Sequence, residues 1–236
     1  MTTPHNPFVK LSRPVIGKGH RQQFRTTDEL CRNHFSTYSE LNHICQSTMT
    51  RALSLLGQRP AVIIETGSSA WGTNSSLLFD SYVNSFGGRF SSVDIRRQPR
   101  RLLRKACSSQ SSFYRGDSVQ FLSAIVDLCS QVDLVYLDSW DVDWTNPVAS
   151  AVHGLREFLM LLPIFRQHGG LLLVDDTPHI DYVSRNLPHL VEPCEKFASQ
   201  YGFTPGKGAL ILEFCKSSGC GKILEHQYQA LINFEP

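Results

Sequence analysis

Residues 170–178 read Gly-Leu-Leu-Leu-Val-Asp-Asp-Thr-Pro, an apolar run that ends in two adjacent aspartates and a proline. A short apolar run bounded by glycine and proline is typical of a buried strand. A second run, Asp-Leu-Val-Tyr-Leu-Asp at 133–138, has the same form and also ends in an aspartate. The pattern therefore predicts two buried strands with carboxylates at their carboxyl ends.

Strand-like and helix-like segments alternate on both sides of these runs. Strands are expected at 61–65, 89–95, 111–115, 133–138 and 170–176, with a closing pair at 209–214 and 227–234. Helices are expected at 71–86, 97–107, 117–129, 147–167 and 190–201. Such alternation predicts an α/β fold, in which a mostly parallel sheet has helices on both faces. Ligands of these sheets bind beyond the carboxyl ends of the strands, so functional residues are expected there.

The residues before 61 follow a different pattern. Residues 1–25 are rich in proline, glycine and basic residues, and we expect them to be flexible. Thr26 and Glu29 have the spacing of a capping box, which predicts helices at about 27–36 and 38–56. The expected organisation is therefore a flexible segment at 1–25, a helical extension at 26–58 and a main domain at 59–236.

Composition excludes several classes of protein. The chain has 236 residues, of which 41% are hydrophobic, so it can build a core and is not a disordered chain. Its net charge of +2 makes nucleic acid an unlikely general partner. No uninterrupted apolar run approaches the roughly 20 residues of a membrane span. The seven cysteines are odd in number and lack metal-type spacing, so we expect reduced thiols and a cytoplasmic location.

The first expected strand runs into a loop of small residues. Glu65 is followed by Thr-Gly-Ser-Ser-Ala-Trp-Gly-Thr-Asn-Ser, which ends at Ser75. Glycines and small polar residues let a ligand approach the backbone closely. The loop matches neither Gly-x-Gly-x-x-Gly nor a phosphate-binding loop with its lysine, so dinucleotide and nucleoside-triphosphate sites are disfavoured. An ordinary glycine-containing turn is the alternative interpretation.

Acidic residues also follow the next two strands. Asp94 ends the second strand, where a carboxylate can bind both hydroxyls of a ribose. Asp117 and Ser118 follow the third strand. Asp117 could cap the next helix, accept a hydrogen bond from an adenine amino group, or do both.

The order of these motifs resembles the class I S-adenosylmethionine-dependent methyltransferases. The resemblance covers residues 61–178 and implies a Rossmann-like sheet of seven strands, with an antiparallel last strand and an N-terminal helical extension. It implies that Glu65 and Gly67 line the methionine part of S-adenosylmethionine and that Asp94 holds its ribose. Asp117 and Ser118 would meet the adenine. The remaining residues that it places in the cofactor site are Ser68, Ser69, Asn74, Ser75 and Asp138.

Within that superfamily the chain is most similar to metal-dependent O-methyltransferases. Catechol O-methyltransferase-like enzymes carry Leu-Asp-His-Trp-Lys after the fourth strand, where this chain has Leu-Asp-Ser-Trp-Asp at 137–141. The pair Asp175-Asp176 resembles the acidic pair of macrolide sugar O-methyltransferases and of relatives of cephalosporin hydroxylase. The lysine of the catechol pattern falls on Asp141, so no lysine base is carried over.

Elementary electrostatics supports a metal site at Asp138, Asp175 and Asp176. If the fourth and fifth strands are neighbours, about 4.8 Å apart, three carboxylates meet at one edge. Close carboxylates repel one another unless they are protonated or neutralised. Mg²⁺, or another hard divalent cation, would neutralise them and bind through oxygen. The alternative is a solvated strand end, with Asp138 contacting only the cofactor.

Two residues are candidates for the catalytic base, although either could be a plain surface residue. Asp141 follows the fourth strand, and His179 follows the acidic pair. Histidine has a pKa suited to proton transfer near neutral pH. A metal-bound hydroxyl needs little help from either.

The sequence therefore predicts S-adenosylmethionine-dependent, metal-assisted O-methylation of a small molecule or sugar. The alternatives are a metal-independent methyltransferase acting on nitrogen or a macromolecule, and a non-catalytic cofactor-binding protein of the same fold. Trp140, Trp144 and Tyr136 could line the substrate mouth, and the insert at 179–208 could cover it. The N-terminal helices could also cover it, or join two copies in a homo-oligomer. The basic run at 96–105 is a solvated helix face or a contact for a polyanion.

Overall fold

The computed structural model describes residues 22–69, 72–128 and 131–236. Most of the segment predicted to be flexible, 1–25, lies outside these residues, as does Trp71 of the first strand-end loop. The chain forms two compact units, Met1–Asp117 and Ser118–Pro236. We call them unit 1 and unit 2 and describe each by itself.

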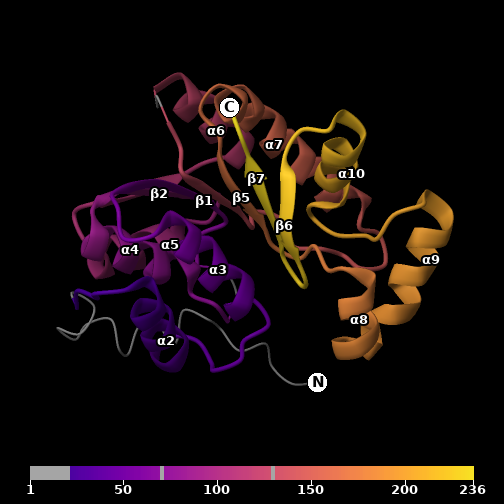
Figure 1. Ribbon diagram of the computed structural model, residues 1–236, viewed down its shortest axis with the longest axis horizontal. Coiled ribbons are helices and arrows are strands. Elements are labelled where there is room, and N and C mark those ends of the chain that lie inside the picture. The colour runs from indigo at the N-terminus through magenta and orange to yellow at the C-terminus, as the bar shows by residue number, and fades with distance from the viewer. Residues whose placement is uncertain (1–21, 70–71, 129–130) are drawn as a thin grey trace. The chain divides into compact units, whose positions relative to one another are not determined.

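Unit 1 contains two N-terminal helices followed by alternating strands and helices (Figure 1). Its elements are α2 (Thr27–Thr37), α3 (Gln46–Leu56), β1 (Ala61–Thr66), α4 (Ser75–Phe86), β2 (Gly88–Asp94), α5 (Arg97–Ala106) and β3 (Ser111–Arg115). The strands are parallel, and β2 lies between β1 and β3. Gly88 has φ +103°, and a Cβ on it would lie 2.0 Å from the carbonyl oxygen of Ala61, so β2 can begin beside β1 only with glycine there.

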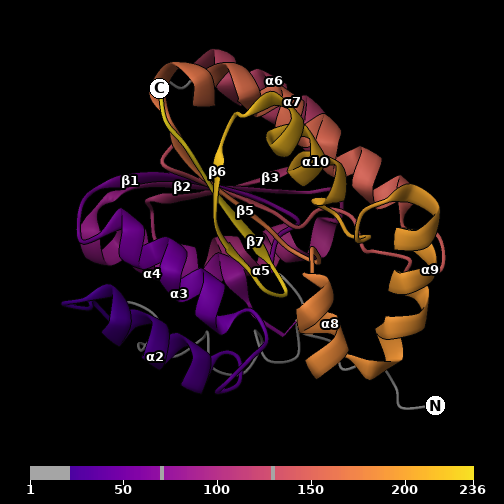
Figure 2. The ribbon, with the colours of Figure 1, turned by 45° about the vertical axis from the view of Figure 1, so that its right-hand side comes forward.

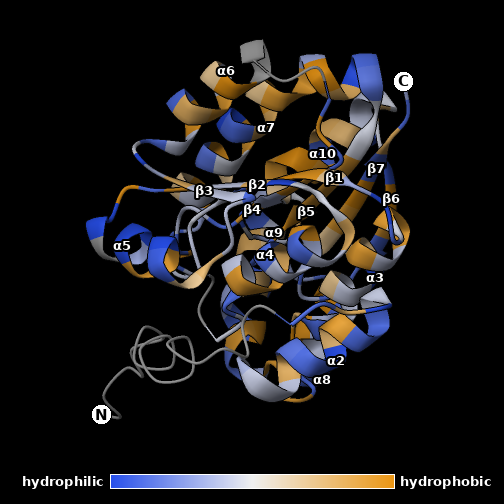
Figure 3. Cartoon of the chain, turned by 90° about the vertical axis from the view of Figure 1, so that its left-hand side faces the viewer, coloured by the Kyte–Doolittle hydropathy of each residue, from blue (hydrophilic) through white to orange (hydrophobic). Residues whose placement is uncertain are grey.

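Helix α5 carries most of the basic run. It is predominantly hydrophilic in Figure 3. Arg97, Arg101, Arg104 and Lys105 are exposed, whereas Leu103 is buried. One face of α5 therefore packs into unit 1 and the other presents cations to solvent, which fits both predicted roles, a solvated helix face and a contact for a polyanion.

Unit 2 contains the other four strands. Its elements are α6 (Ser118–Leu128), β4 (Leu134–Leu137), α7 (Val148–His168), β5 (Gly170–Val174), α8 (Ile180–Asn186), η2 (Pro188–Leu190), α9 (Val191–Tyr201), α10 (Ala209–Ser218), β6 (Lys222–His226) and β7 (Ala230–Phe234). Strands β4 and β5 are parallel, and β7 runs antiparallel to both of its neighbours, β5 and β6. Helix α7 packs against both α6 and α10 (Figure 2).

The predicted fold class is confirmed. The described residues form seven strands, three in unit 1 and four in unit 2, and these alternate with helices along most of the chain. The strand that closes the chain, β7, is antiparallel as predicted. Parallel pairing of β4 with β5 also confirms that the two runs quoted above are neighbouring strands.

The prediction of a closing strand pair at 209–214 and 227–234 is half wrong. Residues 209–214 belong to α10, and the partner of β7 is β6, which the sequence analysis did not identify. The buried residues of α10 include Ala209, Leu212 and Cys215, whose spacing is helical. A short apolar run such as 209–214 is compatible with a strand or a helix. The buried positions of α10 have the spacing of a helix.

Two helix starts were also predicted too early. The second helix begins at Gln46 and not near residue 38, because Asn42 takes a left-handed conformation with φ +62°. Helix α4 begins at Ser75 and not at residue 71, because Asn74 is left-handed, with φ +51°. Left-handed residues do not continue a right-handed helix.

Helix α7 is long and apolar enough, by length and composition alone, to cross a membrane. It is the one such helix among the residues that the structure describes, with a mean hydropathy of 1.4 over its most apolar window. Core helices of folded domains meet the same criterion, and Phe158, Leu161 and Phe165 of α7 are fully buried in unit 2. This one helix is therefore weak evidence for a membrane span.

Candidate functional site

The loop after β1 is organised around the buried carboxylate of Glu65. Ser75 donates to its Oε1 at 2.5 Å, Ser92 donates to Oε2 at 2.6 Å, and Ser76 also donates to Oε2. Burial raises the pKa of Glu65 to about 7, against the lowering effect of the three hydroxyls. Glu65 is fully buried and holds the loop and the start of α4 in place, while its predicted role in the cofactor site stays a prediction.

The other predicted residues of this loop are also tightly held. Gly67 donates its N–H to the carbonyl of Val93 at 2.9 Å, with φ +79°. Ser68 and Ser92 join through their hydroxyls at 2.7 Å. The backbone N–H of Ser69 donates to Ser76 at 2.9 Å. The structure therefore brings Glu65, Gly67, Ser68, Ser69 and Ser75 together at the carboxyl end of β1.

The N-terminal helical extension contacts the far side of this loop. His34 of α2 hydrogen-bonds the carbonyl of Thr73 at 2.7 Å, and Ser39 donates to the carbonyl of Gly72 at 2.6 Å. Asn74 donates its side-chain amide to the carbonyl of Tyr38. Tyr38 and Ser39, which follow α2, therefore join the N-terminal helical extension to the loop after β1.

Asp94, the predicted ribose acid, ends β2 and is 5% exposed. Arg96 makes an ion pair with it at 2.7 Å and two more contacts through Nε at 3.0 and 3.1 Å. The backbone N–H of Arg96 also donates to Asp94 at 2.6 Å. The carboxylate is therefore in place at the strand end, with a 56% exposed arginine side chain as its partner.

Asp117 and Ser118 follow β3. Asp117 is exposed, and Ser118 is the first residue of α6. Within unit 2 the Ser118 hydroxyl lies 3.0 Å from Nε2 of His153 on α7. The same nitrogen lies 3.0 Å from the hydroxyl of Ser139, which donates to the fully buried Glu157 at 2.7 Å. His153 and Glu157 were not predicted as site residues, since no motif in the sequence of α7 distinguishes them.

The predicted acidic cluster forms. Register pairs Leu137 of β4 with Val174 of β5, so the residues that follow, Asp138 and Asp175, leave the two strands side by side. Oxygens of Asp138, Asp175 and Asp176 all lie within 4.8 Å of one another. Asp176 has φ +42°, an uncommon left-handed conformation for a non-glycine residue, and this turns it out of the line of the strand.

A buried lysine completes the cluster, and the sequence analysis missed it. Lys207 donates its ammonium to Asp138 and makes a second ion pair with Asp176 at 3.3 Å, while its side chain is only 1% exposed. Burial lowers the pKa of Lys207, but the three carboxylates outweigh burial and raise it overall. Burial also raises the pKa of Asp138 and of Asp175, and the neighbouring carboxylates add to this while Lys207 opposes it.

Neutral side chains donate to two more oxygens of the cluster. Tyr228 donates its hydroxyl to Oδ1 of Asp176. Gln229 donates its amide to Oδ1 of Asp175 at 2.7 Å. Both residues lead into β7, so the last strand of the chain helps to fix the orientation of the carboxylates.

The backbone around Lys207 is packed so closely that it depends on three glycines. A Cβ on Gly154 of α7 would lie 2.3 Å from the carbonyl oxygen of Lys207. A Cβ on Gly206 would lie 2.5 Å from the carbonyl oxygen of Asp176, and one on Gly208 would lie 2.8 Å from Oγ1 of Thr177. Since all three values are below any ordinary Cβ contact, these glycines let the Lys207 turn fit between α7 and the Asp176–Thr177 turn.

The two predicted bases lie in different surroundings. Asp141 is exposed on the segment that follows β4. His179 is the N-cap of α8, and its Nδ1 accepts the backbone N–H of Asp181 at 3.2 Å. Its ring stands edge-on to His226 at 5.1 Å between centroids, and burial, with His179, lowers the pKa of His226 to about 4. Their roles in proton transfer stay predictions.

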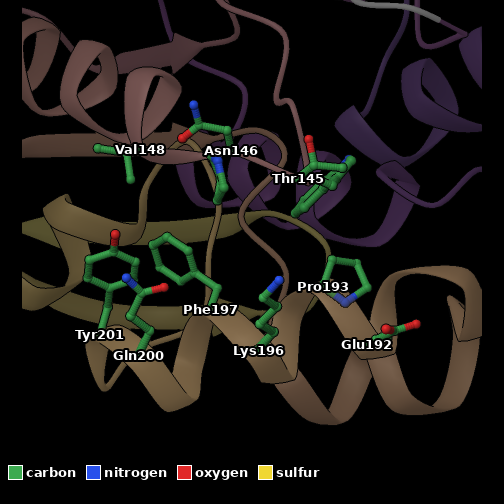
Figure 4. Close-up of a pocket in the computed structure, with 11 residues that line it drawn as sticks. Thr145, Asn146, Val148, Glu192, Pro193, Lys196, Phe197, Gln200 and Tyr201 are labelled. Carbon is green, nitrogen blue, oxygen red and sulfur yellow. The ribbon is translucent and has the colours of Figure 1, made fainter.

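A cavity of about 530 Å³ lies in unit 2, between the segment that follows β4 and helix α9. Figure 4 shows side chains of α9, among them Lys196, Phe197 and Tyr201, facing residues 145–148. Trp144 also lines it and packs against the small core under α8 and α9. Of the three aromatic residues predicted for a substrate mouth, Trp144 lines this cavity, Trp140 is 50% exposed beside His153, and Tyr136 is buried core.

Comparison with known proteins identifies the fold. No protein-family model and no curated protein sequence matches this chain. Among solved structures, the chain is similar to the MycE methyltransferase from the mycinamycin biosynthetic pathway in complex with Mg, SAH and mycinamycin VI, at 16% identity and a TM-score of 0.57. That match covers 87% of this chain and 53% of MycE. A second MycE structure, with Mg and SAH, matches at 15% identity and a TM-score of 0.58, over 90% of this chain and 55% of MycE.

The fold is that of the S-adenosylmethionine-dependent methyltransferases. This confirms the resemblance drawn from the strand-end motifs, at the level of fold. The chain spans about half the length of MycE.

The first prediction concerns Glu65 of the methyltransferase fold. Its pKa is raised from an ordinary 4.5 to about 7, so the folded chain keeps a proton that the unfolded chain releases between these pH values. The free energy of unfolding should therefore fall as pH rises through this window, by about 3 kcal/mol from this group. In Glu65→Gln, the part of the pH dependence of the free energy of unfolding that comes from Glu65 should be absent. Urea unfolding at pH 4, 6 and 8 measures it, with the exposed Glu213→Gln as control; parallel pH profiles for Glu65→Gln and wild type would contradict it.

The second prediction concerns Gly154. Alanine normally stabilises a helix by about 1 kcal/mol relative to glycine. Gly154→Ala should instead destabilise the fold by about 1–3 kcal/mol, because its Cβ would overlap the carbonyl of Lys207. Chemical denaturation measures the change, and Val152→Ala, on an exposed position of α7, should stay within about 0.5 kcal/mol of wild type. If Gly154→Ala is as stable as wild type, the turn that contains Lys207 can shift away from the added Cβ, and the prediction is wrong.

Proposed function

We propose that this protein transfers a methyl group from S-adenosylmethionine to a hydroxyl of a small molecule or sugar, assisted by a divalent metal ion such as Mg²⁺. One observation carries the proposal: Asp138, Asp175 and Asp176 converge at the ends of β4 and β5 in a methyltransferase fold. The fold resembles MycE, whose solved structures contain Mg and SAH.

The residues present fit a hard divalent cation. Carboxylates are the oxygen ligands that Mg²⁺ and Ca²⁺ prefer, and a carboxylate has about four lone-pair sites on its two oxygens. With all carboxylates ionised, the cluster and Lys207 together carry a formal charge of −2. A bound divalent ion would hold acceptor oxygens and lower the pKa of a hydroxyl. Asp138, Asp175 and Asp176 are all proposed as metal ligands, as the sequence predicted.

Cofactor binding is assigned to the strand ends as the sequence analysis predicted. Asp94 would accept hydrogen bonds from the ribose hydroxyls, and the exposed side chain of Arg96 would give up part of its ion pair. Gly67, Ser68, Ser69 and Asn74 would present backbone and small side chains to the methionine part, while Glu65 holds their loop from beneath. Asp117 and Ser118 would meet the adenine, and Ser118 would be oriented by His153.

The reaction forms a bond between the acceptor oxygen and the methyl carbon while the bond between that carbon and the sulfonium sulfur breaks. The sulfur keeps the electron pair, and the hydroxyl proton passes to a base. Asp141 and His179 are the proposed proton acceptors, the first after β4 and the second after the acidic pair. Alignment of the two reactants would supply much of the rate.

The cavity beside α9 is the proposed acceptor site. Its size suits a drug-sized ligand. Trp144, Phe197 and Tyr201 offer aromatic faces, and Asn146 and Gln200 offer amides that can hydrogen-bond hydroxyls. Glu192 and Lys196 bring one charge of each sign, so the lining favours no ionic ligand.

Lys207 favours one alternative. Its ammonium already neutralises part of the cluster, so the three carboxylates could persist without a metal. A metal-independent methyltransferase, acting on nitrogen or a macromolecule, is therefore the second candidate function.

Calorimetric titration of S-adenosylmethionine and of Mg²⁺ distinguishes these functions. Wild type should bind both, and Asp175→Asn should lose at least about 10-fold in Mg²⁺ affinity, because one charged ligand is gone. The same variant should keep its affinity for S-adenosylmethionine.

The control is Glu213→Gln, an equal change of charge at a side chain 38% exposed on α10. Cofactor binding without metal binding in the wild type would support the metal-independent alternative. A wild-type protein that does not bind S-adenosylmethionine would overturn the proposed function.

Replacing Tyr201 tests the acceptor site. For any hydroxylated acceptor that supports turnover, Tyr201→Ala should raise KM by about 2- to 10-fold, the effect of losing one aromatic contact, with kcat little changed. Steady-state kinetics against Glu195→Gln, on an exposed position of α9, provides the comparison. An unchanged KM for every such acceptor would remove the cavity from the binding site.

A further inference from the structure

Lys207 is a buried cation at the centre of an acidic cluster, and no part of the methylation chemistry accounts for it. We propose that Lys207 is the resident counter-charge of the metal site, which limits the affinity of the cluster for its divalent ion. This rests on the metal-assisted function proposed above. Lys207 is here a residue that tunes the site through charge, and it is neither a metal ligand nor a base.

Lys207 is buried among the carboxylates and is not a surface lysine. Its ammonium touches Asp138 and lies 3.3 Å from Asp176, so it bridges the carboxylates that follow two different strands. Its side chain is 1% exposed, against 11% for Asp138 and 20% for Asp176. An ammonium so deeply buried is stable only beside anions, and the pKa of Lys207 is raised by these carboxylates.

The backbone shows that the fold is built to place this lysine. The N–H of Lys207 donates to the carbonyl of Asp176 at 2.9 Å, and the N–H of Gly208 donates to Oγ1 of Thr177 at 2.8 Å. The same Thr177 hydroxyl donates to the carbonyl of Asp175 at 2.7 Å. Together with the three glycines, these bonds tie the lysine turn directly to the turn that carries the acidic pair. Lys207 and the acidic pair are therefore joined by one set of backbone and side-chain hydrogen bonds.

Lys207 could affect metal affinity through its charge or by holding the carboxylates in position, and the two effects predict opposite results when the lysine is replaced. Three ionised carboxylates carry −3, and Lys207 reduces this to −2, so its ammonium repels an incoming cation. If charge dominates, a neutral residue at 207 strengthens metal binding, by roughly 10- to 100-fold for a unit charge at this range. If Lys207 only holds the carboxylates in place, its loss loosens them and metal binding weakens.

Two substitutions separate these effects. Lys207→Met removes both the charge and the hydrogen bond, and Lys207→Gln removes the charge but keeps an N–H donor near Asp138. Mn²⁺ and Mg²⁺ affinities are measured by calorimetry, without reference to turnover. Both variants should bind the ions at least about 10-fold more tightly than wild type. Lys216→Met, a change of equal charge at a side chain 61% exposed on α10, should leave the affinities unchanged.

Asp176→Asn provides the opposite change of charge and tests the proposal if the Lys207 variants do not fold. Tyr228 can still donate to the amide oxygen, and the affinity for Mn²⁺ should fall by at least about 10-fold. Unchanged or stronger Mn²⁺ binding by Asp176→Asn would overturn the proposal.

The outcomes are distinct from those for the proposed function. If wild type binds Mn²⁺ and folded Lys207→Gln binds it with equal or lower affinity, the proposed role of Lys207 is overturned. The metal-assisted function would still stand. Binding by Lys207→Gln but not by wild type removes metal from the native function and supports the counter-charge. Absence of binding by wild type and both Lys207 variants overturns both.

Discussion

Repulsion among three carboxylates is the constraint on which unit 2 depends. Parallel pairing of β4 with β5 brings Asp138 and Asp175 out at the same edge, and the left-handed turn at Asp176 adds a third charge. Such a group is tolerated in a partly buried place only if cations or donors compensate it. The chain supplies Lys207 from the turn before α10, and Tyr228 and Gln229 from the turn between β6 and β7. The segments after β5 therefore complete the sheet and also supply the donors that compensate the charge of the acidic pair.

Unit 1 also contains a buried carboxylate, and there neutral hydroxyl groups provide the hydrogen bonds. Glu65 is fully buried at the end of β1, where no lysine or arginine contacts it among the bonds described, and three serine hydroxyls share its two oxygens. Burial wins over these bonds, so the pKa of Glu65 rises to about 7, whereas Asp94 keeps an arginine as its partner. Two carboxylates at neighbouring strand ends thus have different surroundings, one suited to holding a loop and the other to exchanging partners.

The sequence predicted the features that follow from local pattern. Short apolar runs ending in Glu65, Asp94, Asp138 and Asp175 identified the parallel strands, and the common direction of those strands was enough to predict that Asp138, Asp175 and Asp176 meet. Lys207 could not be predicted in this way, because a lysine between two glycines in a loop reads as an exposed turn. Its burial depends on Gly154 of α7, which is distant in sequence. The hydroxyl shell of Glu65 was hidden for the same reason, since Ser92 comes from another strand.

The proposed acceptor cavity and the acidic cluster are made by the same segments of chain. The segment that leaves Asp138 supplies Trp144 and residues 145–148 to one wall of the cavity. The segment that leaves Asp176 forms α8 and then α9, which supplies the other wall, and the chain returns from α9 directly to Lys207. A ligand that orders these walls would also fix the turns that carry the cluster, because the same backbone hydrogen bonds join Asp176, Thr177 and Lys207. If the proposed function holds, acceptor binding and the arrangement of charge would be coupled through the chain itself, and residues 139–147 and 179–208 would determine the choice of acceptor.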